Sequence, residues 1–218
     1  MEVQESDLVI RRMMHDLRAS IRALRDLPAW IKEDVATAGI SLPDLTLESL
    51  DLLSENAVRL DQYMVDIHSY ARAGGARPDG QVDVAAAWSG LMPDLDLPET
   101  VQIDLDFQAP ILPVDPGDFT SVLRILVENA MRHHHRATQH ILIKTSGVSL
   151  MVADDGPGIA PEFSERVFGF LEKLASQNDT PGSGIGLATA RRLCDGHGGG
   201  IHVEPSGSGG ACFVARFG

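Results

Sequence analysis

The chain has 218 residues, of which 44% are hydrophobic, so it can bury the core of one large domain or of two small ones. Its formal net charge of −13 argues against a nucleic-acid partner, because such a partner needs clustered Lys and Arg. No apolar run approaches the ~20 residues of a membrane helix, and the N-terminus is too charged for a signal peptide, so we expect a cytoplasmic protein without direct membrane contact.

Residues 5–72 predict two antiparallel amphipathic helices, because apolar residues recur there at alternating spacings of three and four. Gly39 and Pro43 lie in the short loop between the helices, and Pro28 is expected to kink the first helix or end it early. One helical hairpin has too little surface for a core. We therefore expect a homodimer through residues 5–72 that forms a four-helix bundle.

The second half of the chain predicts an α+β fold, with one sheet and helices on a single face. A Gly- and Pro-rich linker at 74–80 separates residues 1–73 from a domain at 81–218. The expected strands are 81–84, 101–107, 140–146, 149–154, 200–204 and 211–217, and the expected helices are 85–92, 117–133, 161–168 and 185–196.

Two segments carry polar groups suited to a nucleotide. In LRILVENAMRH (123–133), Asn129 lies on an amphipathic helix, and an amide oxygen is a suitable ligand for Mg²⁺ that bridges phosphates. In VADDGPGIA (152–160), an apolar strand leads to Asp155 and a tight turn, and an ionised carboxylate there can accept a hydrogen bond from the exocyclic amine of adenine. Each motif alone is also common at helix surfaces and in ordinary turns.

Two later segments predict contacts with phosphates. PGSGIGLATARRL (181–193) places three glycines before a helix, where backbone N–H groups and the helix N-terminus favour an anion. VFGFLEKL (167–174) offers Phe168 and Leu171 as apolar anchors, and Lys173 as a cation able to reach a terminal phosphate.

In this order the four segments resemble the N, G1, F and G2 boxes of the ATP-binding domain of sensor histidine kinases, which belong to the GHKL ATPase superfamily. HDLR at 15–18 resembles the H box of their dimerisation and phosphotransfer domain, and the following residues are similar to soluble, phytochrome-like kinases. The resemblance covers nearly the whole chain. It implies a Bergerat-type α/β sandwich at 81–218 that binds ATP with Mg²⁺.

The resemblance also implies a two-component histidine kinase. His15, on the outer side of the first helix, would attack the γ-phosphate with Asp16 as general base, and the phosphoryl group would pass to an Asp of a response regulator receiver domain. A separate or truncated sensor module would supply the signal. Asn129 would hold Mg²⁺, and the nucleotide-binding residues would be Asn129, Arg132, Asp155, Gly156, Gly158, Lys173, Gly182, Ser183, Gly184, Ile185, Gly186 and Leu187.

Several positions depart from the family pattern. Ser20 replaces the usual Pro of the H box, and Ala19 lacks the polar group with which phosphatase-active kinases orient water, so weak or absent phosphatase activity is expected. Ile125 replaces an additional Asn, and in ATP-hydrolysing relatives a glutamate at this place activates water. Gly169 and Leu171 replace the commoner residues of the F box.

Two other functions remain open. A histidine phosphotransfer relay protein would keep His15 but have a kinase-like domain that does not bind ATP. An ATPase or serine kinase on the same fold would not need the exposed His-Asp pair. A metal site at His133, His134, His135 and His140 is disfavoured, because consecutive side chains diverge around a helix end. Cys194 and Cys212 have no metal-ligand spacing and are expected to stay reduced.

Overall fold

The computed structural model describes residues 2–73, 79–132, 138–173 and 182–218, with residues 2–16 and 18 described as backbone only. It divides into two compact units, Met1–His68 and Ser69–Gly218. No helix within the described ranges is long and apolar enough to cross a membrane.

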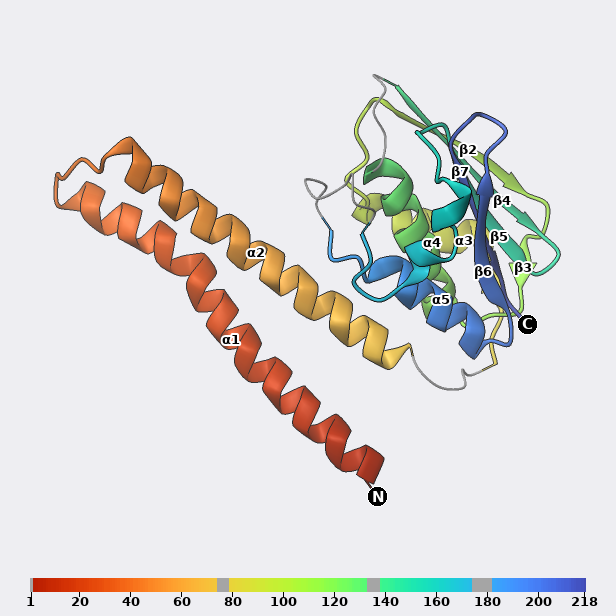
Figure 1. The fold of residues 1–218 in the computed structure, drawn as a ribbon, viewed down its shortest axis with the longest axis horizontal. Helices are drawn as coiled ribbons and strands as arrows, with labels where there is room; N and C mark the ends of the chain where they lie inside the picture. The colour runs from red at the N-terminus through yellow and green to blue at the C-terminus, as the bar shows by residue number, and fades with distance from the viewer. Residues whose placement is uncertain (1, 74–78, 133–137, 174–181) are drawn as a thin grey trace. The chain divides into compact units, whose positions relative to one another are not determined.

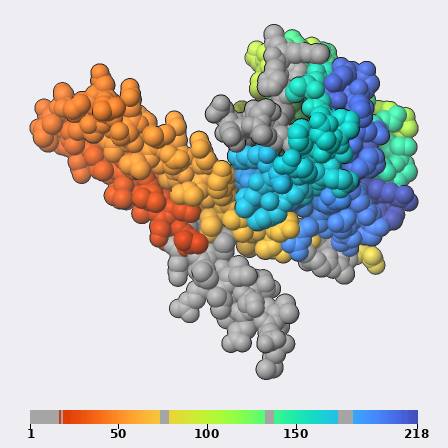
Figure 2. Space-filling model, viewed as in Figure 1, coloured from red at the N-terminus to blue at the C-terminus, as the bar shows by residue number. Residues whose placement is uncertain are grey.

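The first unit is a helical hairpin of α1 (Glu2–Thr37) and α2 (Asp44–Arg72), which lie side by side (Figures 1 and 2). The buried residues at the contact between the two helices recur every seven positions. They are Ile21 and Pro28 on α1, and Leu50, Ala57 and Met64 on α2. Since α1 continues through Pro28 to Thr37, the early end considered from the sequence does not occur.

The second unit contains a five-stranded sheet in the order β2-β4-β5-β7-β6 (Figure 1). The only parallel pair among these strands is β2 with β4, and the other neighbours are antiparallel. A small antiparallel pair, β1 with β3, stands apart from the sheet. The strands are β1 (Val82–Asp83), β2 (Val101–Phe107), β3 (Ile111–Leu112), β4 (Gln139–Ser146), β5 (Ser149–Asp154), β6 (Gly200–Pro205) and β7 (Ala211–Arg216).

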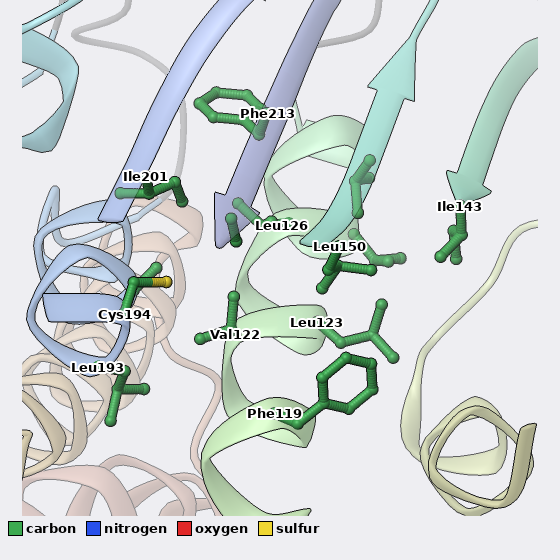
Figure 3. Packing of buried hydrophobic residues seen from close by; sticks show 14 of the residues in the cluster. Phe119, Val122, Leu123, Leu126, Ile143, Leu150, Leu193, Cys194, Ile201 and Phe213 are labelled. Carbon is green, nitrogen blue, oxygen red and sulfur yellow. The ribbon is translucent and has the colours of Figure 1, made fainter. Parts of the chain in front are cut away.

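Three helices cover one face of this sheet, which confirms the predicted α+β sandwich (Figure 1). They are α3 (Val84–Leu91), α4 (Pro116–Arg132) and α5 (Gly186–Gly196). Figure 3 shows the core between the layers: Phe119, Leu123 and Leu126 of α4 point toward Leu150 of β5 and Ile143 of β4. Burial alternates along β4 and β5, as expected for strands with one covered face.

Two predicted elements differ from the structure. The strand expected at 81–84 stops at Asp83, because the Asp83 carboxylate accepts a hydrogen bond from the backbone N of Ala86 at 2.9 Å and begins α3. The helix expected at 161–168 is a pair of 3-10 turns, η2 (Pro161–Phe163) and η3 (Arg166–Phe168). A third such turn, η1 (Met92–Asp94), follows α3.

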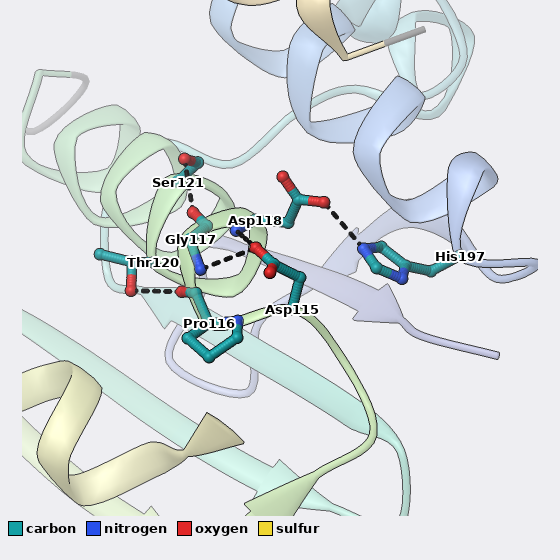
Figure 4. Close-up of polar contacts among 7 residues, drawn as sticks. All are labelled: Asp115, Pro116, Gly117, Asp118, Thr120, Ser121 and His197. Atoms are coloured by element: carbon teal, nitrogen blue, oxygen red, sulfur yellow. Dashed lines mark hydrogen bonds and ion pairs between the residues drawn. The ribbon is translucent and has the colours of Figure 1, made fainter. Parts of the chain in front are cut away.

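The beginning of α4 is joined to the end of α5 by a largely buried polar contact (Figure 4). The Asp115 carboxylate caps α4 by accepting hydrogen bonds from the backbone N atoms of Gly117 and Asp118 at 2.9 and 3.0 Å. The next carboxylate, Asp118 Oδ2, lies 2.9 Å from His197 Nε2, and the two side chains are 15% and 7% exposed. The pair therefore fixes the two helices relative to each other.

We expect His197→Ala to lower the free energy of unfolding by about 1–3 kcal/mol, because it removes a partner from a largely buried carboxylate. Urea unfolding followed by circular dichroism measures the change. The matched control is His202→Ala, since His202 is exposed on β6. Equal losses in the two variants would contradict a stabilising role for the contact with Asp118.

Candidate functional site

The C-terminal half of α4 presents two different faces. Residues on one face are buried under the sheet, including Leu126 and Ala130. The opposite face carries Ile125, Glu128, Asn129 and Arg132, which are partly or fully exposed. Arg132 Nη2 donates a hydrogen bond to Glu128 Oε2 at 2.8 Å. The amide of Asn129 and the cation of Arg132 thus lie on one helical stripe.

The glycine segment before α5 lies against this stripe. A Cβ placed on Gly182 would be 3.8 Å from Arg132 Nη1, and one placed on Gly186 would be 3.5 Å from Ile125 Cγ2. Between them the Ser183 hydroxyl accepts a hydrogen bond from the backbone N of Ile185 at 3.2 Å, and Ile185 is fully buried. The loop is therefore anchored by Ile185, and its glycines approach α4 closely.

Residues 165–173 are held by the same loop and by α5. Gly184 has a φ of +73°, and a Cβ there would be 2.7 Å from the carbonyl oxygen of Glu172, so only glycine fits. Arg191 of α5 forms an ion pair with Glu165 at 3.0 Å, and its guanidinium lies 5.4 Å from the centre of the buried Phe168 ring. Lys173 follows Glu172 directly and is half-buried, so it lies beside the glycine loop.

An aromatic cluster holds Phe170 within the second unit, which begins at Ser69 and so includes the end of α2. The Tyr70 and Phe170 rings lie 4.6 Å apart, and the Arg192 guanidinium lies 4.4 Å from the centre of the Tyr70 ring. Phe170 is followed by Leu171, which has a φ of +61°, the only positive value found for a described residue other than glycine. Backbone strain is thus stored directly before Glu172 and Lys173.

Two neighbouring carboxylates are buried where β5 ends. Asp155 Oδ1 accepts a hydrogen bond from the backbone N of His140 at 3.0 Å. Asp154 Oδ1 accepts hydrogen bonds from the backbone N atoms of Gly156 and Ala211, at 2.9 and 3.1 Å. Both side chains are less than 8% exposed.

A buried glutamine brings these carboxylates to the same end of the sandwich as Asn129. Gln139, the first residue of β4, donates a hydrogen bond from Nε2 to the carbonyl oxygen of Ala130 at 2.6 Å. His140, its neighbour, binds Asp155. The end of α4 is therefore bordered by the glycine segment on one side and by the end of β5 on the other.

The structure thus brings together most of the predicted site residues. Asn129, Arg132, Asp155 and the segments around Gly156 and Gly182–Leu187 surround the end of α4. The backbone of His15 and Asp16 belongs to α1, but their side chains lie outside the described residues.

The other candidate groups supply no further site. His133, His134 and His135 lie outside the described residues, and within the described ones no group of three His, Cys, Asp or Glu could hold a metal ion. Burial raises the pKa of the Cys194 thiol to about 12 and that of the Cys212 thiol to about 11. Both thiols therefore stay protonated at neutral pH and are poor nucleophiles.

One functional candidate was missed from the sequence. Leu150, Val152 and Asp154 alternate along β5 and are all buried on the face covered by α4, whereas Asp155 comes after the strand has ended. The alternation of a half-buried strand therefore points to Asp154 as the carboxylate on the side of Asn129. Only the DGxG turn was considered in the sequence, so Asp155 was selected.

Comparison with known proteins agrees with this geometry. Residues 114–218 match the family described as histidine kinase-, DNA gyrase B-, and HSP90-like ATPase. The sensor protein RstB of Escherichia coli is 26% identical over 94% of this chain and 51% of its own length. The adaptive-response sensory kinase SasA of Parasynechococcus marenigrum is 28% identical over 97% of this chain and 59% of its own length. The chain thus spans about half to three-fifths of these relatives.

Solved structures share the fold. Full-length ShkA in complex with AMPPNP superposes with a TM-score of 0.69 at 21% identity, over 95% of this chain and 45% of that chain. The mycobacterial sensor histidine kinase MprB superposes with a TM-score of 0.54 at 18% identity, over 64% of this chain and 98% of that chain. Residues 114–218 therefore form a domain that matches the histidine kinase-, DNA gyrase B-, and HSP90-like ATPase family, and the chain is similar to sensor kinases over nearly its whole length.

Proposed function

We propose that this chain is the catalytic core of a two-component histidine kinase, which uses ATP and Mg²⁺ to phosphorylate His15 and then passes the phosphoryl group to an Asp of a response regulator. The observation that carries the proposal is the convergence at the end of α4. There, Asn129 and Arg132 face a glycine segment, and two buried carboxylates lie beside the same helix end.

The phosphate end of this site fits a magnesium-bound triphosphate. Gly182, Gly184 and Gly186 leave the loop backbone accessible before the N-terminus of α5, which favours an anion. Arg132 and Lys173 would supply cations near the loop, and Asn129 would supply an oxygen ligand for Mg²⁺. Bound Mg²⁺ would neutralise phosphate charge during transfer.

The end of the site at Asp154 and Asp155, the base end, offers a buried carboxylate that can accept a hydrogen bond from adenine. Asp155, the candidate from the sequence, follows the last residue of β5, and its Oδ1 accepts a hydrogen bond from the backbone of β4. Asp154 lies on the sheet face that α4 covers, and two backbone N–H groups fix its carboxylate. We therefore assign recognition of the exocyclic amine to Asp154, with Asp155 holding the turn against β4.

We expect Asp154→Asn to weaken ATP binding about tenfold or more, because it replaces a charge-assisted hydrogen bond worth about 1.5–3 kcal/mol. Asp155→Asn should weaken binding less than about threefold, since an amide oxygen still accepts from the backbone of His140. Calorimetric titration with ATP and Mg²⁺ measures both affinities. If Asp155→Asn weakened ATP binding more than Asp154→Asn, the adenine contact would belong to Asp155.

The proposed transfer forms a bond between one imidazole nitrogen of His15 and the γ-phosphorus, and breaks the bond from that phosphorus to the ADP oxygen. Asp16 would accept the hydrogen bond of the other ring nitrogen and stabilise the developing positive charge. The phosphorylated imidazole would then transfer its phosphoryl group to the Asp carboxylate of the response regulator. Ala19 has no polar group to orient a hydrolytic water, so weak phosphatase activity is expected.

Incubation with ATP labelled at the γ-phosphate, followed by phosphopeptide mapping, tests the transfer. We expect an acid-labile label on the peptide that contains His15, and its loss in His15→Ala. The matched control is His68→Ala, because His68 lies on the other helix of the hairpin. Labelling that survives in His15→Ala would overturn the proposed mechanism.

The residues of the same site distinguish the proposed kinase from two other functions, a phosphotransfer relay protein and an ATPase. A phosphotransfer relay protein would show no ATP binding, whereas the presence of Asn129, Arg132 and the glycine segment favours a working nucleotide site. An ATPase on this fold would need a group that activates water near the glycine segment. The aliphatic Ile125 packs against Gly186 at that place, which disfavours hydrolysis.

A homodimer through residues 5–72 is supported by a second set of heptad positions on the hairpin. Leu17, Leu24 and Ile31 on α1, and Leu53, Leu60 and Ile67 on α2, lie beside the buried seam and are 37–53% exposed in the single chain. Each set repeats at seven residues, the period of a bundle interface. The hairpin of a second chain would cover both of these exposed apolar stripes, one on α1 and one on α2.

We expect Leu60→Glu to convert the dimer to a monomer at micromolar concentration, because it places a charge in the interface between hairpins. Light scattering measures the mass. Val58→Glu is the matched control, since Val58 is 55% exposed on the same helix but away from the stripe. A monomeric unmodified chain would exclude the bundle.

A further inference from the structure

The turn between β6 and β7, Ser206–Gly210, lies against the end of β5. It is closed by a hydrogen bond from the backbone N of Ser206 to the carbonyl oxygen of Gly210 at 2.8 Å. Within the turn, the backbone N of Ser208 donates to the Ser206 hydroxyl at 3.1 Å, and the two hydroxyl oxygens lie 2.5 Å apart. The turn is therefore rigidly bonded, with Ser208 at its tip.

This turn contacts Asp154 from two directions. The Ser208 hydroxyl donates a hydrogen bond to the carbonyl oxygen of Asp154 at 3.0 Å. A Cβ placed on Gly210 would be 2.3 Å from both the carbonyl oxygen and Oδ1 of Asp154, so only glycine fits beside this carboxylate. The next residue, Ala211, donates its backbone N–H to the same Oδ1.

The turn also meets the glycine turn that follows β5. Gly158 has a φ of +74°, and a Cβ there would be 3.3 Å from the carbonyl oxygens of Gly209 and Gly210. Two glycine turns thus face each other without an intervening side chain, and Asp154 lies where they join. A shift of one turn would move the Asp154 backbone, because Ser208 is bonded to it.

We infer that Ser208 is a positioning residue for adenine recognition: its hydroxyl fixes the backbone of Asp154, and the Asp154 carboxylate is thereby held in the orientation that receives the exocyclic amine. This rests on the proposed function, which assigns adenine to Asp154. In this proposal Ser208 acts through Asp154 and would not itself contact the nucleotide. Its effect is therefore restricted to ligands that carry the amine.

The test compares ATP with purine riboside triphosphate, which lacks the exocyclic amine, by calorimetric titration of the full chain with Mg²⁺. The unmodified chain should bind ATP about tenfold or more tightly than the analogue, as expected when one buried polar contact is lost. Ser208→Ala should weaken ATP binding about three- to tenfold and leave the affinity for the analogue unchanged. A displaced Asp154 carboxylate weakens only the hydrogen bond from the exocyclic amine, which the analogue lacks. Ser208→Thr, which keeps the hydroxyl, should restore the preference.

The matched control is Ser121→Ala, which removes a hydroxyl bonded to the carbonyl oxygen of Gly117 on the exposed side of α4. It should leave both affinities unchanged. Equal weakening of both ligands in Ser208→Ala, or an unaltered preference, overturns the positioning role alone. An unmodified chain that binds neither ligand, or binds both equally, overturns the assignment of adenine to Asp154 and the inference with it.

Discussion

The packing of α4 on the sheet is the constraint on which the site depends. Its inner face, with Phe119, Leu123 and Leu126 fully buried, fixes the helix over β4 and β5. Burying each such side chain contributes about 1.5–3 kcal/mol, which far exceeds any single polar contact at the surface. Because the same helix carries Asn129 and Arg132 on its other face, the core also positions the polar groups proposed to bind the nucleotide.

The fold was largely predictable from local patterns. The strands predicted at 101–107 and 149–154 have the observed bounds of β2 and β5. Short elements were not predictable, since β3 has two residues and its formation depends on pairing with β1 rather than on its own sequence. Pro28 illustrates a tertiary effect: packing of the buried ring against the hairpin seam offsets the cost of the missing backbone donor.

The candidate site was predictable as a set of segments but not as a set of contacts. The order of the motifs identified Asn129 and the glycine segment, whereas the choice between adjacent carboxylates depended on which side chain faces α4. That choice requires the strand to end at Asp154 and the backbone of His140 to engage Asp155. No local propensity encodes the second contact, because β4 and the turn are brought together only by the folded sheet.

The two ends of the site differ in how firmly their groups are held. At the base end, buried carboxylates accept backbone hydrogen bonds, so their orientation is set before a ligand arrives. At the phosphate end, the ion pair that Arg132 forms within the described part of the chain is with Glu128, four residues earlier on the exposed side of α4. Exposed pairs of this kind contribute about 0.3–0.5 kcal/mol, so Arg132 can leave Glu128 for a phosphate at little cost. Firmly held carboxylates beside an easily redirected Arg132 would suit the proposed transfer, in which adenosine stays bound while the terminal phosphate moves to another group.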